Sequence, residues 1–130
     1  MSLVYSYNYD TTYNSAMPMA EIVIGRAMNG PFLSLLALVD SGADATLIPI
    51  SYLRQIRARL SRKTWMRGTT GERILIDLYP ISLRLGSFMQ AHLEVVGDTE
   101  NNEIILGRDV LNHLSVTLNG PASSVEIADS

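Results

Sequence analysis

Residues 36–49 read LALVDSGADATLIP, an apolar segment that leads into an acidic turn and then into a second apolar segment. A carboxylate at the end of a buried β-strand is unfavourable unless it is neutralised or hydrogen-bonded, so Asp40 needs a partner or a function. Ser41 offers a hydroxyl that can tie the turn to neighbouring backbone. Gly42 has no Cβ and lets another chain approach Asp40 closely. The sequence therefore places its candidate catalytic carboxylate at Asp40.

Two segments together resemble the signature blocks of the retropepsins, the single-domain aspartic proteases of the retroviral type. They are DSGADAT at residues 40–46 and ILGRDVL at residues 105–111, and the resemblance spans residues 21–127 in order and spacing. Asp-Ser-Gly alone is a weak signal, because three common residue types coincide in many proteins. Two blocks flanked by apolar strands are more specific. The resemblance implies an all-β fold, a retropepsin-like closed half-barrel with one or two short helices, and an aspartic endopeptidase that hydrolyses peptide bonds.

The chain holds one such turn, since Asp98-Thr99-Glu100 lacks the glycine. An aspartic protease needs two carboxylates, because one accepts a proton from water while the other, protonated, donates to the scissile carbonyl. One turn supplies half of that site. We therefore predict a two-fold homodimer in which the two copies of Asp40 face each other across the axis and act on a peptide or protein substrate.

The resemblance also implies roles for residues around Asp40. Ser41 hydrogen-bonds the two active-site loops across the dimer, and Asp44 contacts the substrate backbone while pairing with Arg108 of its own subunit. We interpret Thr46 as a packing residue and Asp109 as a helix-end residue. The expected site comprises Asp40 as catalyst; Ser41, Gly42 and Ala43 in the active-site loop; Gly42, Asp44, Arg67, Gly68, Thr69, Thr70 and Gly71 in substrate binding; and Thr46, Gly107 and Arg108 in support. The plainer alternatives are a turn-forming Asp40 and unrelated surface charges at positions 44 and 108.

The rest of the chain reads as strands with two short helices. We expect residues 1–20 to form a tyrosine-rich N-terminal arm and residues 21–130 to form the protease domain. Tyrosines alternate with other residues at positions 5, 7 and 9, which is typical of an edge strand with one aromatic face. We expect strands at 20–25, 32–39, 47–48, 81–85, 92–96 and 104–106, and a final hairpin that turns at 119–121. Pro49 is expected to open a helix with Leu53, Ile56 and Leu60 on one side, and residues 108–113 a second helix.

Residues 64–78 predict a β-hairpin with a polar tip, RGTTG, at residues 67–71. Glycines on both sides of this tip allow bending and positive φ. The resemblance makes the hairpin a flap that closes over bound peptide and excludes water. The alternative is an ordinary surface hairpin.

The composition of the chain argues against several other classes of function. The 130 residues, 47% of them hydrophobic, suffice for one core, and the absence of cysteine excludes disulfides and thiolate metal sites. His92 and His113 are the only histidines, so we expect no metal and no cofactor. A net charge of −3 and the lack of a long apolar segment predict no nucleic-acid partner, no membrane segment and a cytoplasmic location.

Six of the ten basic residues lie between positions 54 and 67 with no acidic residue among them. They form either a solvated helix face or a positive rim near the hairpin that attracts acidic peptides or another anionic partner, including nucleic acid. A further alternative to the protease is a catalytically weak dimerisation or peptide-binding module with the same fold.

Overall fold

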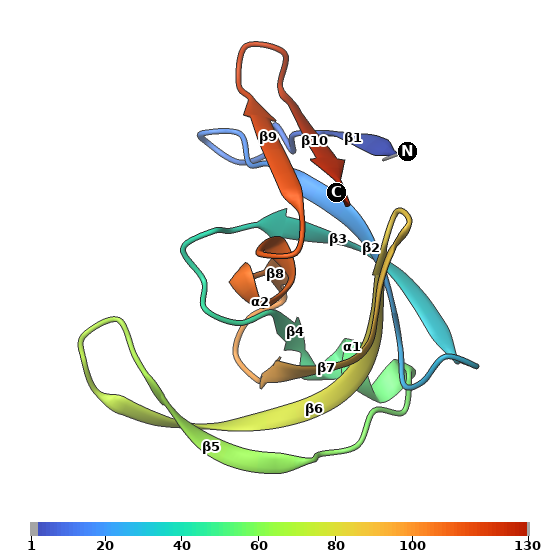
Figure 1. Cartoon of the computed structure of the whole chain (residues 1–130). Coiled ribbons are helices and arrows are strands. Elements are labelled where there is room, and N and C mark those ends of the chain that lie inside the picture. The colour runs from blue at the N-terminus through green and yellow to red at the C-terminus, as the bar shows by residue number, and fades with distance from the viewer. Residues whose placement is uncertain (1–2, 130) are drawn as a thin grey trace.

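The structure is a computed structural model that describes residues 3–129, and within them it is built from β-strands with two short helices, as predicted (Figure 1). In chain order the elements are β1 Val4–Asn8, β2 Met19–Gly25, β3 Phe32–Val39, β4 Leu47–Pro49, α1 Ile50–Gln55, β5 Arg62–Arg67, β6 Arg73–Leu85, β7 Phe88–Asp98, β8 Ile105–Leu106, α2 Arg108–Leu111, β9 Ser115–Asn119 and β10 Ser124–Ala128. No helix within residues 3–129 is long and apolar enough to cross a membrane.

Seven strands form the main sheet, in the order β2-β3-β8-β4-β7-β6-β5. An additional antiparallel pairing joins β2 to β6, with Val23 opposite Arg84 and Gly25 opposite Ser82. This pairing closes six of the strands into a ring, which leaves β5 outside it as one arm of the β5–β6 hairpin. The sheet is thus the closed half-barrel expected from the sequence.

The core fills the inside of this ring. β2 shows the two-residue alternation of a strand with one buried face, because Ala20, Ile22 and Ile24 are fully buried while Glu21 is exposed. Other fully buried large side chains come from α1, β6, β7, β8, α2 and β10: Leu53, Ile81, Leu83, Leu85, Val95, Leu106, Val110 and Ile127. This packing fixes the ends of β3 and β8, from which the candidate site is built.

The first and last strands form a second, three-stranded sheet in the order β1-β10-β9. Tyr5 and Tyr7 of β1 lie opposite Ile127 and Val125 of β10 and are half-buried, whereas Ser6 between them is exposed. The predicted edge strand with one aromatic face is therefore present. The division at residue 20 into an arm and a domain stays a prediction.

Helix α1 is shorter than predicted. It ends at Gln55, and Arg57 has a φ of 58°, which turns the chain out of the helical path. Leu60 consequently lies beyond the helix with an exposed fraction of 47%, so the prediction that it shares the buried side of the helix with Leu53 and Ile56 is wrong. Helix α2 also ends early, at Leu111 rather than His113.

Strand β6 is longer than predicted. The hairpin strand and the separate strand expected at 81–85 are one element of 13 residues that continues through Pro80. Its first part pairs with β5 and its second part with β7, while residues 82–84 also pair with β2. Because β6 is shared in this way, the projecting hairpin is anchored directly in the barrel.

Candidate active site

The acidic turn begins where β3 ends, and its backbone is held by β8. β3 and β8 run parallel, with Val39 opposite Leu106, and the Asp40 N–H donates to the Leu106 carbonyl over 3.1 Å. Val39 itself is buried and its N–H donates to the Pro18 carbonyl over 2.9 Å. The Asp40 side chain is thereby held, half-buried, at the end of β3 beside β8.

Within the turn, one carboxylate oxygen of Asp40 is already bound. The Gly42 N–H donates to Asp40 Oδ1 over 2.9 Å, and the Ala43 N–H donates to the Asp40 carbonyl over 3.2 Å. A Cβ on Gly42 would lie 3.1 Å from Asp40 Oδ1, a tight contact, so a larger residue here would push this oxygen aside by a few tenths of an ångström. Within residues 3–129, no hydrogen bond reaches Asp40 Oδ2, so this oxygen is available to a water or to a second carboxyl group.

Thr46 and Asp109 form a buried network beneath the turn. Thr46 is fully buried; its N–H donates to Asp109 Oδ2 over 2.9 Å and its hydroxyl to Asp109 Oδ1 over 2.7 Å. The Gly107 N–H in turn donates to Thr46 Oγ1 over 3.1 Å. Thr46 is therefore a hydrogen-bonding centre that joins the two signature blocks, which the packing interpretation missed. A buried hydroxyl residue in one block and a carboxylate in the other were the available signal.

Gly107 marks the closest approach of the two blocks. A Cβ at this position would lie 2.6 Å from the backbone of Ala45 and 3.1 Å from the Ala43 carbonyl, so no larger residue fits without moving the turn. The following N–H, that of Arg108, donates to the Ala43 carbonyl over 2.9 Å. The start of α2 thus packs directly against the acidic turn.

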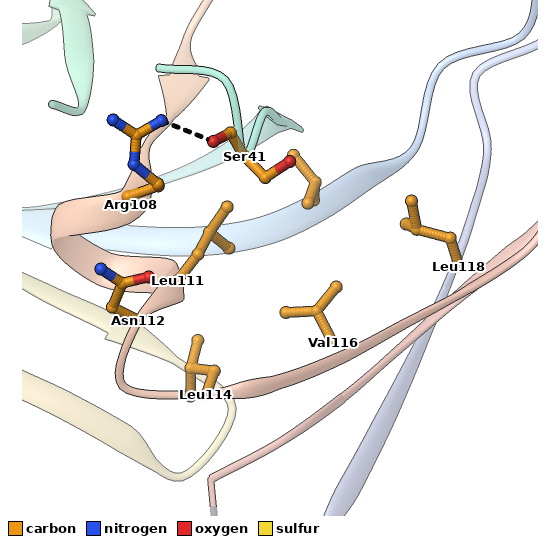
Figure 2. A pocket seen from close by; sticks show the side chains of 8 residues that line it. Ser41, Arg108, Leu111, Asn112, Leu114, Val116 and Leu118 are labelled. Atoms are coloured by element: carbon orange, nitrogen blue, oxygen red, sulfur yellow. Dashed lines mark hydrogen bonds between the residues drawn. The ribbon is translucent and has the colours of Figure 1, made fainter. Parts of the chain in front are cut away.

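The Arg108 side chain binds the turn from its outer side. Its guanidinium donates to the Ser41 carbonyl over 2.7 Å (Figure 2). The same guanidinium forms an ion pair with Asp44. The side chains of Arg108 and Asp44 are 41% and 75% exposed, so solvent screens their attraction and the pair adds little stability. Its structural effect is to hold the backbone of Ser41. The Ser41 hydroxyl lies in the exposed part of the turn, and its expected bond across a dimer stays a prediction.

The tip of the β5–β6 hairpin lies apart from these residues. Within residues 3–129 no hydrogen bond joins residues 67–71 to residues 40–46, although the hairpin extends to the side of the molecule on which the β3–β4 loop lies (Figure 1). The tip is a closed turn, in which the Gly68 N–H donates to the Glu72 carbonyl over 2.7 Å and Gly71 has a φ of 88°.

Beneath the hairpin is a cavity of about 500 Å³. Apolar residues of the hairpin and of the barrel line it together with a polar loop: Leu47, Met66, Ile74, Leu75, Ile76, Val96, Gly97 and residues 98–101, with Lys63 and Asp77 at one side. Lys63 and Asp77 form an ion pair of 2.6 Å across the hairpin. The cavity offers an apolar surface that a bound segment could fill.

A second hollow lies next to the turn, and we call it the β9 groove. It has a volume of about 330 Å³ and is lined by Ser41, Arg108, Asn112 and five apolar residues, Val39, Leu111, Leu114, Val116 and Leu118. Figure 2 shows the labelled side chains of α2 and β9 gathered along it. The acidic turn therefore borders an apolar surface on the side of β9.

The basic segment at residues 54–67 is not one solvated helix face. It runs from α1 through the following connection into β5, and acidic residues from other strands neutralise part of it. Arg62 pairs with Glu94 over 3.2 Å, and Lys63 pairs with Asp77. Within residues 3–129, no group of three or more His, Asp or Glu residues could hold a metal ion.

Comparison with known families settles what kind of fold surrounds this turn. The family description "Retroviral aspartyl protease" matches residues 14–119, which include both signature blocks and the hairpin. The chain belongs to the retroviral aspartyl protease family. No curated protein sequence is significantly similar to it.

Two solved structures resemble this retroviral aspartyl protease chain. One is a retropepsin-like aspartic protease from Rickettsia conorii, with a TM-score of 0.65, 10% identity and coverage of 98% of this chain and 94% of that one. The other is the EIAV protease in complex with the inhibitor HBY-793, with a TM-score of 0.54, 20% identity and coverage of 74% of this chain and 86% of that one. At these identities the likeness establishes the retropepsin fold.

Proposed function

We propose that the protein is an aspartic endopeptidase that acts as a homodimer. The observation that carries the proposal is the geometry of Asp40 in a chain of the retroviral aspartyl protease family. Hydrogen bonds to β8 and from Gly42 hold Asp40 at the end of β3, and one of its carboxylate oxygens receives no hydrogen bond from residues 3–129. A single copy contributes one such carboxyl group. A second copy, related by two-fold symmetry, completes the pair.

The chemistry follows from the pair. One Asp40 carboxylate takes a proton from a water molecule, which attacks the scissile carbonyl, while the other, protonated Asp40 donates its proton to the carbonyl oxygen. The tetrahedral intermediate then collapses: the C–N bond breaks, the leaving amine takes a proton from the carboxyl pair, and one hydroxyl of the intermediate returns a proton to the pair as the carboxylic acid forms. The roles of base and acid alternate between identical residues, and the reaction as proposed uses no cofactor.

Substrate binding is proposed for the space between the hairpin and the acidic turn. An extended peptide can lay apolar side chains into the cavity below the hairpin, which Met66, Ile74 and Ile76 line. The glycine-flanked tip at residues 67–71 can then close over the peptide. Asp44, exposed beside the turn, can accept hydrogen bonds from peptide N–H groups.

The decisive experiment replaces Asp40 by Asn. The amide keeps the shape of the side chain but cannot take a proton from water, and the substitution removes both halves of the symmetric pair at once. We expect cleavage of an unfolded protein substrate at acidic pH to disappear while the fold survives. Asp10→Asn, in a turn outside the family match, is the matched control and should cleave like the parent.

Cleavage by Asp40→Asn at the parental rate would refute the assignment. A parent protein that forms dimers and binds peptide without cleaving it would instead support the peptide-binding module. As a second test, specific activity should fall on dilution through the dimer dissociation constant, because monomers hold half a site. Full activity at a concentration where sedimentation shows only monomers would exclude the dimeric mechanism.

A further inference from the structure

One side of strand β3 has no partner strand over most of its length. β3 pairs with β2 from Phe32 to Leu38, but on its other side β8 reaches only Leu38 and Val39. The segment FLSLL at residues 32–36 therefore borders no strand on this side within residues 3–129. It contains no charge and no proline, the features that usually protect an exposed edge from pairing. By contrast, β5 at the end of the same sheet carries three basic residues.

The register shows which backbone groups of this edge are unpaired. The Leu38 N–H donates to the Ile104 carbonyl over 2.8 Å, so Leu38 directs its N–H away from β2. Alternate residues of a strand direct these groups to the same side, so Phe32, Ser34 and Leu36 also face away from β2, whereas the residues between them pair with it. The edge thus offers three N–H and three C=O groups at the spacing of an extended peptide.

Two adjacent cavities follow this edge, and we call them together the β3 groove. The first, of about 270 Å³, is lined by both Leu35 and Leu36, whose side chains lie on opposite faces of β3, so it follows the edge itself. The second, of about 560 Å³, lies between β1 and Leu36. Met19 and Leu36 line both cavities, and Leu36 is 60% exposed. The β3 groove therefore has an apolar floor that is open to solvent.

The rim of the β3 groove is acidic and aromatic. Asp10 and Glu103 line it, and Glu21 lies opposite Leu36 in the pairing of β2 with β3. Among the lining residues in the described part of the chain, none is lysine, arginine or histidine. Four tyrosines also line the groove: Tyr7, Tyr9, Tyr13 and Tyr52. Carboxylates and tyrosine ring faces both attract cations, so the groove is complementary to a basic ligand.

We propose that the β3 groove is a second peptide-binding site, which takes an extended polypeptide segment with lysine or arginine between apolar residues. The segment adds as a strand to residues 32–36, its apolar side chains cover Leu36, and its basic side chains reach the acidic rim. A second copy of this chain fits this edge less well, because the carboxylates around the two grooves would then face each other.

This site is distinct from the proposed catalytic one. Of the residues that the structure describes, none lines both the β3 groove and the cavity below the hairpin. Leu36 precedes Asp40 by four residues of extended chain, which is about 13 Å along the strand. A long polypeptide can therefore be held in the β3 groove while another part of it occupies the cavity below the hairpin.

Binding of defined peptides tests the charge of the site. The host is the full chain with Asp40→Asn, and the probe is a labelled decapeptide of alternating valine and lysine, which should bind about ten-fold more tightly than its valine–glutamate counterpart and less tightly as salt rises. Glu21→Gln with Glu103→Gln keeps the acceptors for Ser34 and Tyr13 and removes two charges, so the affinity should fall about ten-fold. Glu126→Gln, exposed on β10, is the control and should bind like the host. Equal affinity for the two peptides would overturn the proposal.

A matched pair of leucine variants tests the place of binding. Leu36→Lys puts a positive charge on the floor of the groove and should weaken binding of the valine–lysine peptide about ten-fold. Leu60→Lys, at a leucine that is 47% exposed and lies outside the groove, should bind like the host. Urea unfolding of both variants verifies that they are folded. Equal binding by the two would overturn the assignment to the β3 groove.

Amide hydrogen exchange tests the geometry. The bound peptide should slow exchange at Phe32, Ser34 and Leu36 and leave the residues between them unchanged, because those already pair with β2. Protection elsewhere without these three N–H groups would overturn the added strand. A smaller sedimentation coefficient of Leu36→Lys without peptide would identify a second copy as the occupant and overturn the peptide proposal. None of these measurements requires cleavage, so the failure of either this proposal or the proposed function leaves the other standing.

Discussion

Replacing Thr46 by Val tests the hydrogen-bonded network beneath the acidic turn. Valine keeps the size and branching of threonine but removes the hydroxyl, which donates to Asp109 over 2.7 Å and accepts from the Gly107 N–H over 3.1 Å. The lost bond to a carboxylate is worth about 1.5–3 kcal/mol, and leaving the buried Gly107 N–H without a partner costs about 1–3 kcal/mol. Because the two losses share one site and are not additive, we expect the free energy of unfolding to fall by about 3 kcal/mol.

Thr46→Ser is the matched control, because it keeps the hydroxyl and removes one buried methyl group. Its expected loss is about 1 kcal/mol. Urea unfolding of both variants, at one protein concentration so that the dimer contributes equally, gives the comparison. For a domain of this size, about 3 kcal/mol corresponds to a fall in melting temperature of about 12 °C. A Thr46→Val protein as stable as Thr46→Ser would show that Thr46 acts by packing alone and would refute the network argument.

Two further predictions concern charged pairs at the surface. Arg108→Ala should lower the free energy of unfolding by only about 1–2 kcal/mol, because its ion pair with Asp44 is exposed. The same variant should lower the rate of cleavage strongly, because it loses the hydrogen bond to the Ser41 carbonyl. Asp44→Asn keeps this hydrogen bond, so equal activity in the two variants would contradict the prediction. The hydrogen bond from Arg62, followed by that from Ser61, lowers the pKa of Glu94 below its ordinary value. The Glu94 carboxylate therefore stabilises the fold at pH values above its unfolded pKa, and this stabilisation is lost as the pH falls through the lowered pKa of the folded protein. In Glu94→Gln, urea midpoints should therefore change less between about pH 5 and pH 3 than in the parent, and identical profiles would show that the pair is not formed in solution.

The sequence predicted those parts of the fold that depend on local pattern. Apolar segments located β2 and β3, and the glycines and prolines located the turns between strands. The proximity of residues 40–46 to residues 105–111 was accessible because both blocks follow apolar strands and together match one family. The close packing of Gly107 against Ala45 gives the physical reason why these two blocks occur together.

The features that the sequence did not reveal depend on contacts between distant residues. The helical spacing of Leu60 with Leu53 and Ile56 predicted a longer helix, but the chain leaves the helix at Arg57 to enter β5. Likewise, the 63 positions between Thr46 and Asp109 hide their hydrogen bonds from any local pattern. The pairing of β2 with β6, which closes the barrel, is equally non-local.

The β5–β6 hairpin carries the single tryptophan of the chain. Trp65 is 55% exposed, and the Arg73 guanidinium lies 4.7 Å from the centre of its ring, across the two strands. Tryptophan emission from the whole protein therefore originates at one known point on the hairpin. Trp65 is not among the residues that line the cavity below the hairpin, so its emission follows movement of the hairpin itself and not contact with a bound peptide. The unlabelled protein thus carries its own optical reporter of hairpin position, readable in real time during a binding or unfolding experiment.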